Sequence, residues 1–189
     1  MTYDATKLLV PLADAKTYLA ITDTAEDSLI GYLLQSISEM FATMCDRPLL
    51  SGAYTDYLYG EGQPTIYLNT YPVDTAEDIT VAVDEKRAFG SDTQLDADDI
   101  WVSAAIGSIT KIGGVFRRGV PIKVTYTGGY ASIPLDLRLA ALEALGMMWK
   151  RNKDKRFDVT SMSRGDVNYQ FSNELPPTVS DVLKRYRRG

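Results

Sequence analysis

Any chemistry in this chain would have to come from carboxylates, one thiol or glycine-rich turns, because the sequence contains no histidine. Histidine is the commonest general base and the commonest metal ligand. The acidic run at residues 96–99 lacks the regular ligand spacing and the final glutamate of a calcium-binding loop. Its adjacent carboxylates, Asp98 and Asp99, would point to opposite sides of a strand. We therefore predict a solvated loop here, and a hydrolase with paired carboxylates is the least favoured class.

The thiol and the glycine pairs are equally unpromising for catalysis. Cys45 is the single cysteine and lies near the predicted end of a helix, where the helix dipole raises a thiol pKa. We expect a small buried side chain there. The paired glycines match neither the dinucleotide-binding nor the P-loop pattern. The sequence therefore predicts no catalytic, cofactor-binding or metal-binding residue, and a protein that is not an enzyme.

The charges are divided unevenly along the chain. Residues 1–110 hold 5 lysines and arginines against 18 acids, and residues 111–189 hold 15 against 7, so a −13 half and a +8 half give the total of −5. This pattern indicates an interaction tail, self-association or nucleic-acid contact, or a polarised surface without a partner. The basic clusters at 150–156 and 184–188 are short, and the acidic remainder would repel phosphate. We expect no sequence-specific DNA binding.

Helical periodicity occurs in two parts of the chain, one before and one after the middle region. The pattern predicts a short helix at 8–20 and a long one at 24–46, whose apolar stripe is Leu29, Ile30, Leu33, Leu34, Ile37, Met40, Phe41 and Met44. A second long helix is predicted at 134–151, after a strand that ends at Gly128-Gly129 and a loop that ends at Pro134. Its predicted buried face is Leu135, Leu139, Leu142, Leu145 and Trp149.

The period changes to that of strands between the long helices. Residues 52–127 contain short apolar runs separated by glycines, which predict an antiparallel sheet or small sandwich. Residues 54–59 and 65–68 flank a glycine-rich turn and are predicted to form a hairpin. Pro121 is expected at a strand start or on an edge strand. The predicted fold class is α+β: two long packed helices, an inserted β region and a C-terminal arm, with a core at 1–156 and the arm at 157–189.

The arm contains a short predicted strand and a short amphipathic helix, neither long enough to be stable alone. Both need a surface to pack on. We expect that surface to belong to a partner; the alternative is that the arm folds back on its own domain. The predicted interface residues are Val167, Tyr169, Phe171, Val179, Val182, Leu183, Lys184, Arg185, Tyr186, Arg187 and Arg188.

A series of motifs in a fixed order resembles one family. The series is Leu29-Ile-Gly-Tyr-Leu-Leu34, Arg47 at the end of that helix, Tyr59-Gly-Glu-Gly62, Leu68-Asn-Thr-Tyr-Pro-Val73, Val124-Thr-Tyr-Thr-Gly-Gly-Tyr130 with Ile133-Pro134, Gly165-Asp166, and Val182-Leu-Lys-Arg-Tyr-Arg-Arg188. Together they cover most of the chain and resemble the head-tail connector (adaptor) proteins of tailed double-stranded DNA bacteriophages. The β insertion is longer than in the smallest, mostly helical members.

The resemblance implies a structural protein of the virion neck, assembled in the host cytoplasm. It implies a ring, twelvefold in the virion, beneath the portal protein. Such a ring extends the channel through which packaged DNA passes and presents a surface to stopper or tail proteins. It implies no cofactor, and no apolar run approaches the roughly 20 residues that span a membrane.

Two other classes of protein remain as alternatives. One is a different neck component, a stopper or tail-completion protein, which is usually shorter, resembles a β-barrel and would lack the two long helices. The other is a β-rich ligand-binding or glycan-binding module. That module would need a concave aromatic site and would not need a basic arm.

Overall fold

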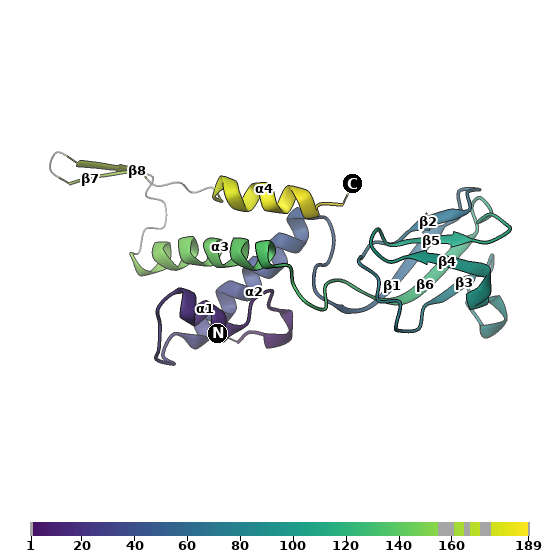
Figure 1. The fold of residues 1–189 in the computed structure, drawn as a ribbon, viewed down its shortest axis with the longest axis horizontal. Coiled ribbons are helices and arrows are strands. Elements are labelled where there is room, and N and C mark those ends of the chain that lie inside the picture. The colour runs from purple at the N-terminus through teal and green to yellow at the C-terminus, as the bar shows by residue number, and fades with distance from the viewer. Residues whose placement is uncertain (1, 155–160, 165–166, 171–174, 189) are drawn as a thin grey trace. The chain divides into compact units, whose positions relative to one another are not determined.

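The computed structural model describes residues 2–154, 161–164, 167–170 and 175–188 (Figure 1). The chain forms two compact units. Residues 1–47 and 133–189 form the helical unit, and residues 48–132 form the β unit. The predicted α+β class is confirmed. The division into units differs from the predicted one, because the C-terminal residues belong with the helices and the β region is a unit of its own.

The helical unit contains four α-helices and a small hairpin among its described residues. The helices are α1 (Leu12–Tyr18), α2 (Asp27–Met44), α3 (Leu135–Lys153) and α4 (Pro177–Tyr186), and a 3-10 turn, η1, covers Ala5–Lys7. The hairpin strands are β7 (Ser161–Arg164) and β8 (Val167–Gln170), which pair antiparallel with each other. α3 packs against α1, α2 and α4.

The predicted stripe of α2 is largely the face that the unit buries. Ile30, Leu34, Ile37 and Phe41 are buried, whereas Met44 at the helix end is exposed. α2 begins at Asp27, three residues after the predicted start, and its N-terminus has no side-chain cap.

The predicted buried face of α3 is wrong at its first two leucines, whereas Leu142 and Trp149 are half-buried. Leu145 is buried, but Leu135 is 80% exposed and Leu139 is 53% exposed. The face that packs inward is Leu137, Ala140, Ala141, Ala144 and Leu145. Apolar residues lie on every side of this helix, so periodicity alone could not select the buried face.

This assignment predicts opposite effects for two leucines of one helix. Leu145→Ala should lower the free energy of unfolding by about 2–5 kcal/mol, because it leaves a cavity in a packed core. Leu139→Ala should change it by less than about 0.5 kcal/mol, because the side chain is mostly in solvent. Urea denaturation of both variants measures the difference. Equal losses would mean that the buried face of α3 is misassigned.

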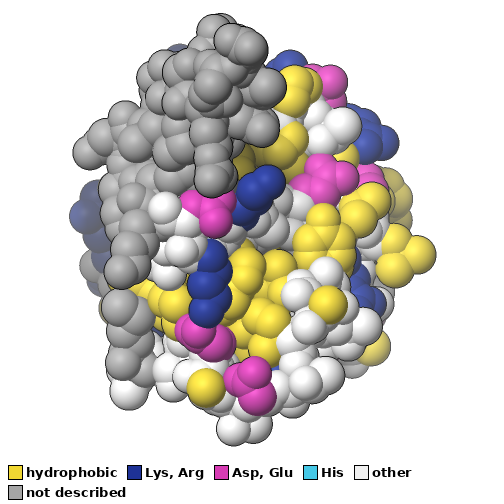
Figure 2. Space-filling view, turned by 90° about the vertical axis from the view of Figure 1, so that its left-hand side faces the viewer, with side chains coloured by type: hydrophobic (Ala, Val, Ile, Leu, Met, Phe, Trp, Pro, Cys, Tyr) yellow, Lys and Arg dark blue, Asp and Glu magenta, His cyan; other side chains and the backbone are white. Residues whose placement is uncertain are grey.

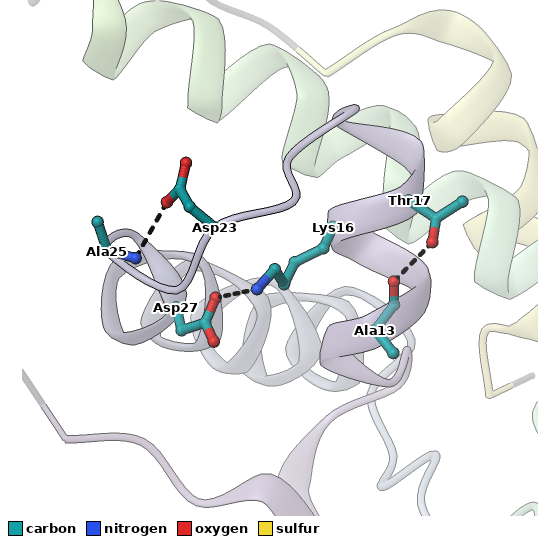
Figure 3. A network of polar contacts seen from close by, with 6 residues as sticks. All are labelled: Ala13, Lys16, Thr17, Asp23, Ala25 and Asp27. Carbon is teal, nitrogen blue, oxygen red and sulfur yellow. Dashed lines mark hydrogen bonds and ion pairs between the residues drawn. The ribbon is translucent and has the colours of Figure 1, made fainter.

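Polar contacts fix the connection between α1 and α2 (Figure 3). The Lys16 ammonium pairs with the Asp27 carboxylate at 2.7 Å, and the amide of Ala25 donates to the Asp23 carboxylate at 3.0 Å. The Thr17 hydroxyl donates to the Ala13 carbonyl within α1. The Lys16–Asp27 pair joins α1 to the start of α2, and the other two bonds order the loop and α1 themselves.

The β unit consists of two three-stranded antiparallel sheets. One has the order β1-β6-β3 and the other the order β2-β5-β4. The strands are β1 (Gly52–Tyr59), β2 (Thr65–Tyr67), β3 (Thr80–Val83), β4 (Ile100–Ser103), β5 (Ser108–Lys111) and β6 (Pro121–Gly128). Two 3-10 turns, η2 (Ser91–Thr93) and η3 (Ala97–Asp99), lie between β3 and β4. The predicted small sandwich is confirmed in outline, because side chains from both sheets share one core.

The predicted hairpin between β1 and β2 is wrong. β1 pairs with β6 along its whole length, from Gly52 opposite Gly128 to Tyr59 opposite Pro121, and β2 pairs with β5. The turn after β1 bonds to another loop, since the amide of Gly62 donates to the Phe116 carbonyl at 2.8 Å. Pro121 stands at the start of β6, as predicted.

A buried polar cluster locks the β unit. The Asp56 carboxylate in β1 accepts hydrogen bonds from the Tyr126 hydroxyl at 2.9 Å and from the backbone and side-chain amides of Asn69 at 2.7 and 2.9 Å. The Tyr126 hydroxyl in turn accepts from the amide of Thr70 at 3.0 Å. Asp56 and Tyr126 are both buried, so these bonds satisfy groups that water does not reach.

This cluster predicts a loss of stability in alkali. Burial raises the pKa of Tyr126 to about 12. In the unfolded chain a tyrosine loses its proton near pH 10, so between about pH 10 and 12 the unfolded state releases a proton that the folded state keeps. Stability should fall by about 2–3 kcal/mol over that range, and this group contributes no change below it. The Tyr126→Phe variant should lack this loss of stability, whereas Tyr67→Phe, at an exposed tyrosine, should retain it. Unfolding curves recorded at pH 9–12 measure both.

Candidate docking surface of the C-terminal helix

α4 folds back onto its own unit. Val179 and Leu183 are both buried, and Figure 1 shows α4 alongside α3. Pro176 and Pro177 start the helix, since proline suits the first turn, where no amide partner is needed. The Thr178 hydroxyl donates to the Glu143 carboxylate of α3 at 2.8 Å. Val179 and Leu183, which were predicted to contact a partner, therefore pack within the same chain.

The end of α4 is bonded to the end of α2. Arg47 is only 4% exposed, and its Nε donates to the Tyr186 carbonyl at 2.9 Å. A cation at this place meets the negative end of the α4 dipole. The amide of Arg188 donates to the Cys45 carbonyl at 2.9 Å. These bonds hold the last described residues of the chain against the C-terminal end of α2.

Two side chains of α4 converge on the first turn of α3. The Tyr186 hydroxyl donates to the Asp136 carboxylate at 2.6 Å, and the Arg185 guanidinium lies 3.5 Å from the other oxygen of that carboxylate. Lys184 is exposed and pairs with exposed Asp181 at 2.8 Å, and this contact lowers the pKa of Asp181. Exposed pairs of this kind contribute little to stability.

The structure separates the predicted interface residues into groups. Val179 and Leu183 are buried within the unit, and Val182, Tyr186 and Arg188 are half-buried. Lys184, Arg185 and Arg187 remain exposed. Val167 and Tyr169 lie in β8, and Phe171 lies outside the described residues. The exposed cations of α4 are therefore what this helix offers to a partner.

Cys45 is a buried packing residue, as the sequence predicted. It is fully buried, and burial raises the pKa of its thiol, with the Arg47 charge acting in the opposite direction. In the described part of the chain, histidine, cysteine and acidic side chains form no group of three that could hold a metal ion. The described helices include none long and apolar enough to cross a membrane.

The profile of one protein family, described as "Head completion protein", matches residues 8–189. The chain belongs to this family. Membership confirms the predicted relationship to the connector proteins of tailed phages, and it makes the role of this head completion protein a structural one. No protein in the curated set that we searched is similar enough to count as a relative.

The chain also shares its fold with chains in solved structures of gene transfer agent particles. A chain in the structure named "Neck of empty GTA particle computed with C6 symmetry" is 17% identical with a TM-score of 0.66, and the match covers 98% of this chain and 93% of that one. A chain in "Virion of native gene transfer agent (GTA) particle" is 17% identical with a TM-score of 0.66, and the match covers 99% of this chain and 92% of that one. A chain in "Neck of native GTA particle computed with C12 symmetry" is 16% identical with a TM-score of 0.64, and the match covers 99% of this chain and 92% of that one. These likenesses are to the fold of the whole chain.

The helical unit of this head completion protein leaves apolar side chains in solvent. Leu135 and Leu139 are exposed on α3, and Tyr18, Tyr32 and Met44 are exposed on α1 and α2. Figure 2 shows hydrophobic side chains gathered between charged ones on one face of the molecule. Leu135 and Leu139 were predicted to be buried, because their spacing matches that of a buried stripe.

The charge division of the sequence largely disappears in the fold of the head completion protein. The helical unit holds 14 lysines and arginines and 14 acids, whereas the β unit holds 6 against 11 and carries the net charge of −5. Arg138 pairs with Asp14, and Lys153 pairs with Glu26, so late bases meet early acids within one chain. The net negative charge of the chain therefore lies in the β unit, and the helical unit is neutral.

Proposed function

We propose that this head completion protein is the adaptor of a phage-type neck. In this proposal, twelve copies form a ring beneath the portal protein, extend the DNA channel without reading DNA sequence, and present a surface to stopper or tail proteins. The ring is a part of the virion neck, and its role is architectural rather than enzymatic.

One observation carries the proposal: α2 and α3, 18 and 19 residues long, pack together in a single unit. A stopper or tail-completion protein with a barrel-like fold would lack such a pair. The likeness to chains of gene transfer agent particles supports the same role, since it extends over nearly the whole chain and two of those structures are of necks computed with C6 or C12 symmetry. Closed rings of identical subunits arise when two different surfaces of one chain meet.

The exposed cations of α4 are the proposed contact with the portal. Lys184, Arg185 and Arg187 stand together at the end of one helix, and Arg185 is 65% exposed. The half-buried Val182 would add to the same surface. Contacts of exposed charges are screened beyond about 8 Å at physiological salt, so the attachment should weaken as salt rises.

Mass photometry of the purified chain with portal rings, at low and at high salt, tests the proposal. We expect a complex that contains twelve copies of the chain for each portal ring. Replacing Lys184, Arg185 and Arg187 with alanine should weaken that complex at least tenfold. A matched control replaces Lys86, Arg117 and Arg118, which are exposed on the β unit. A chain that stays monomeric with the portal present at every salt concentration would exclude the adaptor role.

A further inference from the structure

A cavity of about 390 Å³ opens on the surface of the β unit. Three consecutive residues of β1 line it, 57–59, and so do three consecutive residues of β2, 65–67. Successive side chains of a strand point to opposite faces, so a cavity that touches three in a row lies along the edge of the strand rather than over a face. The cavity is therefore a seam between the edges of β1 and β2.

Both edges at this seam are without a partner strand. In the described part of the chain, β1 pairs only with β6 and β2 pairs only with β5. The backbone pattern confirms which way the groups point. The amide of Gly60 bonds to the Val120 carbonyl at 2.9 Å, and Tyr59 stands opposite Pro121, which has no amide hydrogen. Antiparallel pairs alternate, so the backbone groups of Tyr57 and Tyr59 point away from β6.

The same reasoning applies to β2. The amide of Leu68 bonds to the Gly107 carbonyl, and the amide of Lys111 bonds to the Pro64 carbonyl, both at 2.7 Å. The backbone groups of Thr65 and Tyr67, which alternate with these, point away from β5. Two rows of backbone donors and acceptors thus border one cavity. Exposed strand edges of this kind are templates for another strand.

Elsewhere in the chain, β7 and β8 form a hairpin of two strands. β7 and β8 pair with each other, and as far as the structure describes the chain they join no other strand. A two-stranded hairpin alone is marginally stable in water. Its surroundings are basic, since residues 150–170 hold 6 lysines and arginines against 3 acids, whereas the β unit carries −5 and Glu61 lines the seam. The hairpin and the seam are therefore complementary: each has unpaired strand edges, and their surroundings carry opposite charges.

We propose that the seam between β1 and β2 receives the β7–β8 hairpin of a second copy of this chain by strand addition. The inference rests on the proposed ring, because it names a contact between neighbouring subunits. Backbone hydrogen bonds would supply affinity, as in other cases of β-augmentation. Tyr57, Tyr59 and Tyr67, all exposed, would cover the added strand with aromatic side chains.

Photo-crosslinking tests this contact directly. A photoreactive phenylalanine replaces Tyr67, which is 59% exposed, and in a control chain it replaces Trp101, which is 60% exposed on the edge strand β4. Isotope-labelled and unlabelled chains are mixed and assembled, with the portal where the chain alone stays monomeric. We expect position 67 to join peptides from residues 161–170 of the other chain, and position 101 not to do so. A chain with residues 161–170 replaced by a glycine-serine linker should give no such link.

A charge at the seam supplies a second readout. Lysine on an edge opposes strand addition, so Tyr67→Lys should weaken self-association at least tenfold, and Trp101→Lys less than twofold, at unchanged melting temperature. Rings that form normally without the crosslink would overturn the inference and leave the adaptor role standing. Links only within one chain, or links to other segments, would also overturn it. Failure to form rings under any condition would overturn both.

Discussion

Deletion of residues 175–189 should unfold the helical unit or lower its melting temperature by more than 10 °C. Val179 and Leu183 lie on the buried side of α4, and each contributes about 1.5–3 kcal/mol through burial. The deletion also removes the hydrogen bond from the Arg47 Nε to the Tyr186 carbonyl, and a hydrogen bond of a charged group contributes about 1.5–3 kcal/mol. The combined loss is comparable to the total stability of a typical domain, about 5–15 kcal/mol.

The two tryptophans allow each unit to be followed separately. Trp149 lies in α3 and Trp101 lies in β4, so single-tryptophan variants report on the helical and β units in turn. The deletion should shift the Trp149 transition and leave the Trp101 transition nearly in place. As a control, alanine at Lys184, Arg185 and Arg187 in the full chain should leave both transitions within about 0.5 kcal/mol for each residue. A truncated chain with unchanged helix content and melting temperature would contradict the fold-back of α4 and restore the free docking arm.

The contrast between α2 and α3 shows when hydrophobic periodicity predicts the buried face of a helix and when it does not. On α2, apolar residues follow one face and polar residues the other, so the pattern specified the buried side as far as Phe41. On α3, leucines lie on both sides of a run of alanines, and the alanines form the contact. Small residues allow close helix packing but carry a weak hydropathy signal. The exposed leucines dominated the pattern for that reason.

Partners that are distant in sequence explain the other differences. Local rules favour pairing β1 with the next strand, but its actual partner, β6, begins at Pro121, more than sixty residues after Tyr59. Pairing of that range depends on the whole core and on the shared bonds of Asp56 and Tyr126. The apolar side of α4 is a second case in which the sequence does not identify the partner. An amphipathic pattern shows that a surface must cover it, and does not show which molecule supplies that surface.

The strand-to-helix turn at Gly128-Gly129, by contrast, was predictable from residue type alone. Gly129 has φ +91°, in the region that favours glycine. A Cβ atom there would lie 2.2 Å from the carbonyl oxygen of Leu50. The surrounding backbone cannot easily yield, because the amide of Gly129 bonds to the Pro72 carbonyl and the amide of Tyr130 bonds to the Leu49 carbonyl, each at 2.9 Å. Both a dihedral requirement and a close approach therefore demand glycine.

Gly129→Ala should accordingly lower the free energy of unfolding of the β unit by more than about 3 kcal/mol, since dihedral strain of about 1–2 kcal/mol adds to the backbone clash. Gly113→Ala separates the two causes. Gly113 has φ +68° but no atom within 4 Å of its Cβ position, so its substitution should cost only the dihedral strain. Urea denaturation followed by Trp101 fluorescence measures both variants. Equal losses would show that the approach of Leu50 to Gly129 is loose enough to relax, and that the turn needs glycine for its dihedral angle alone.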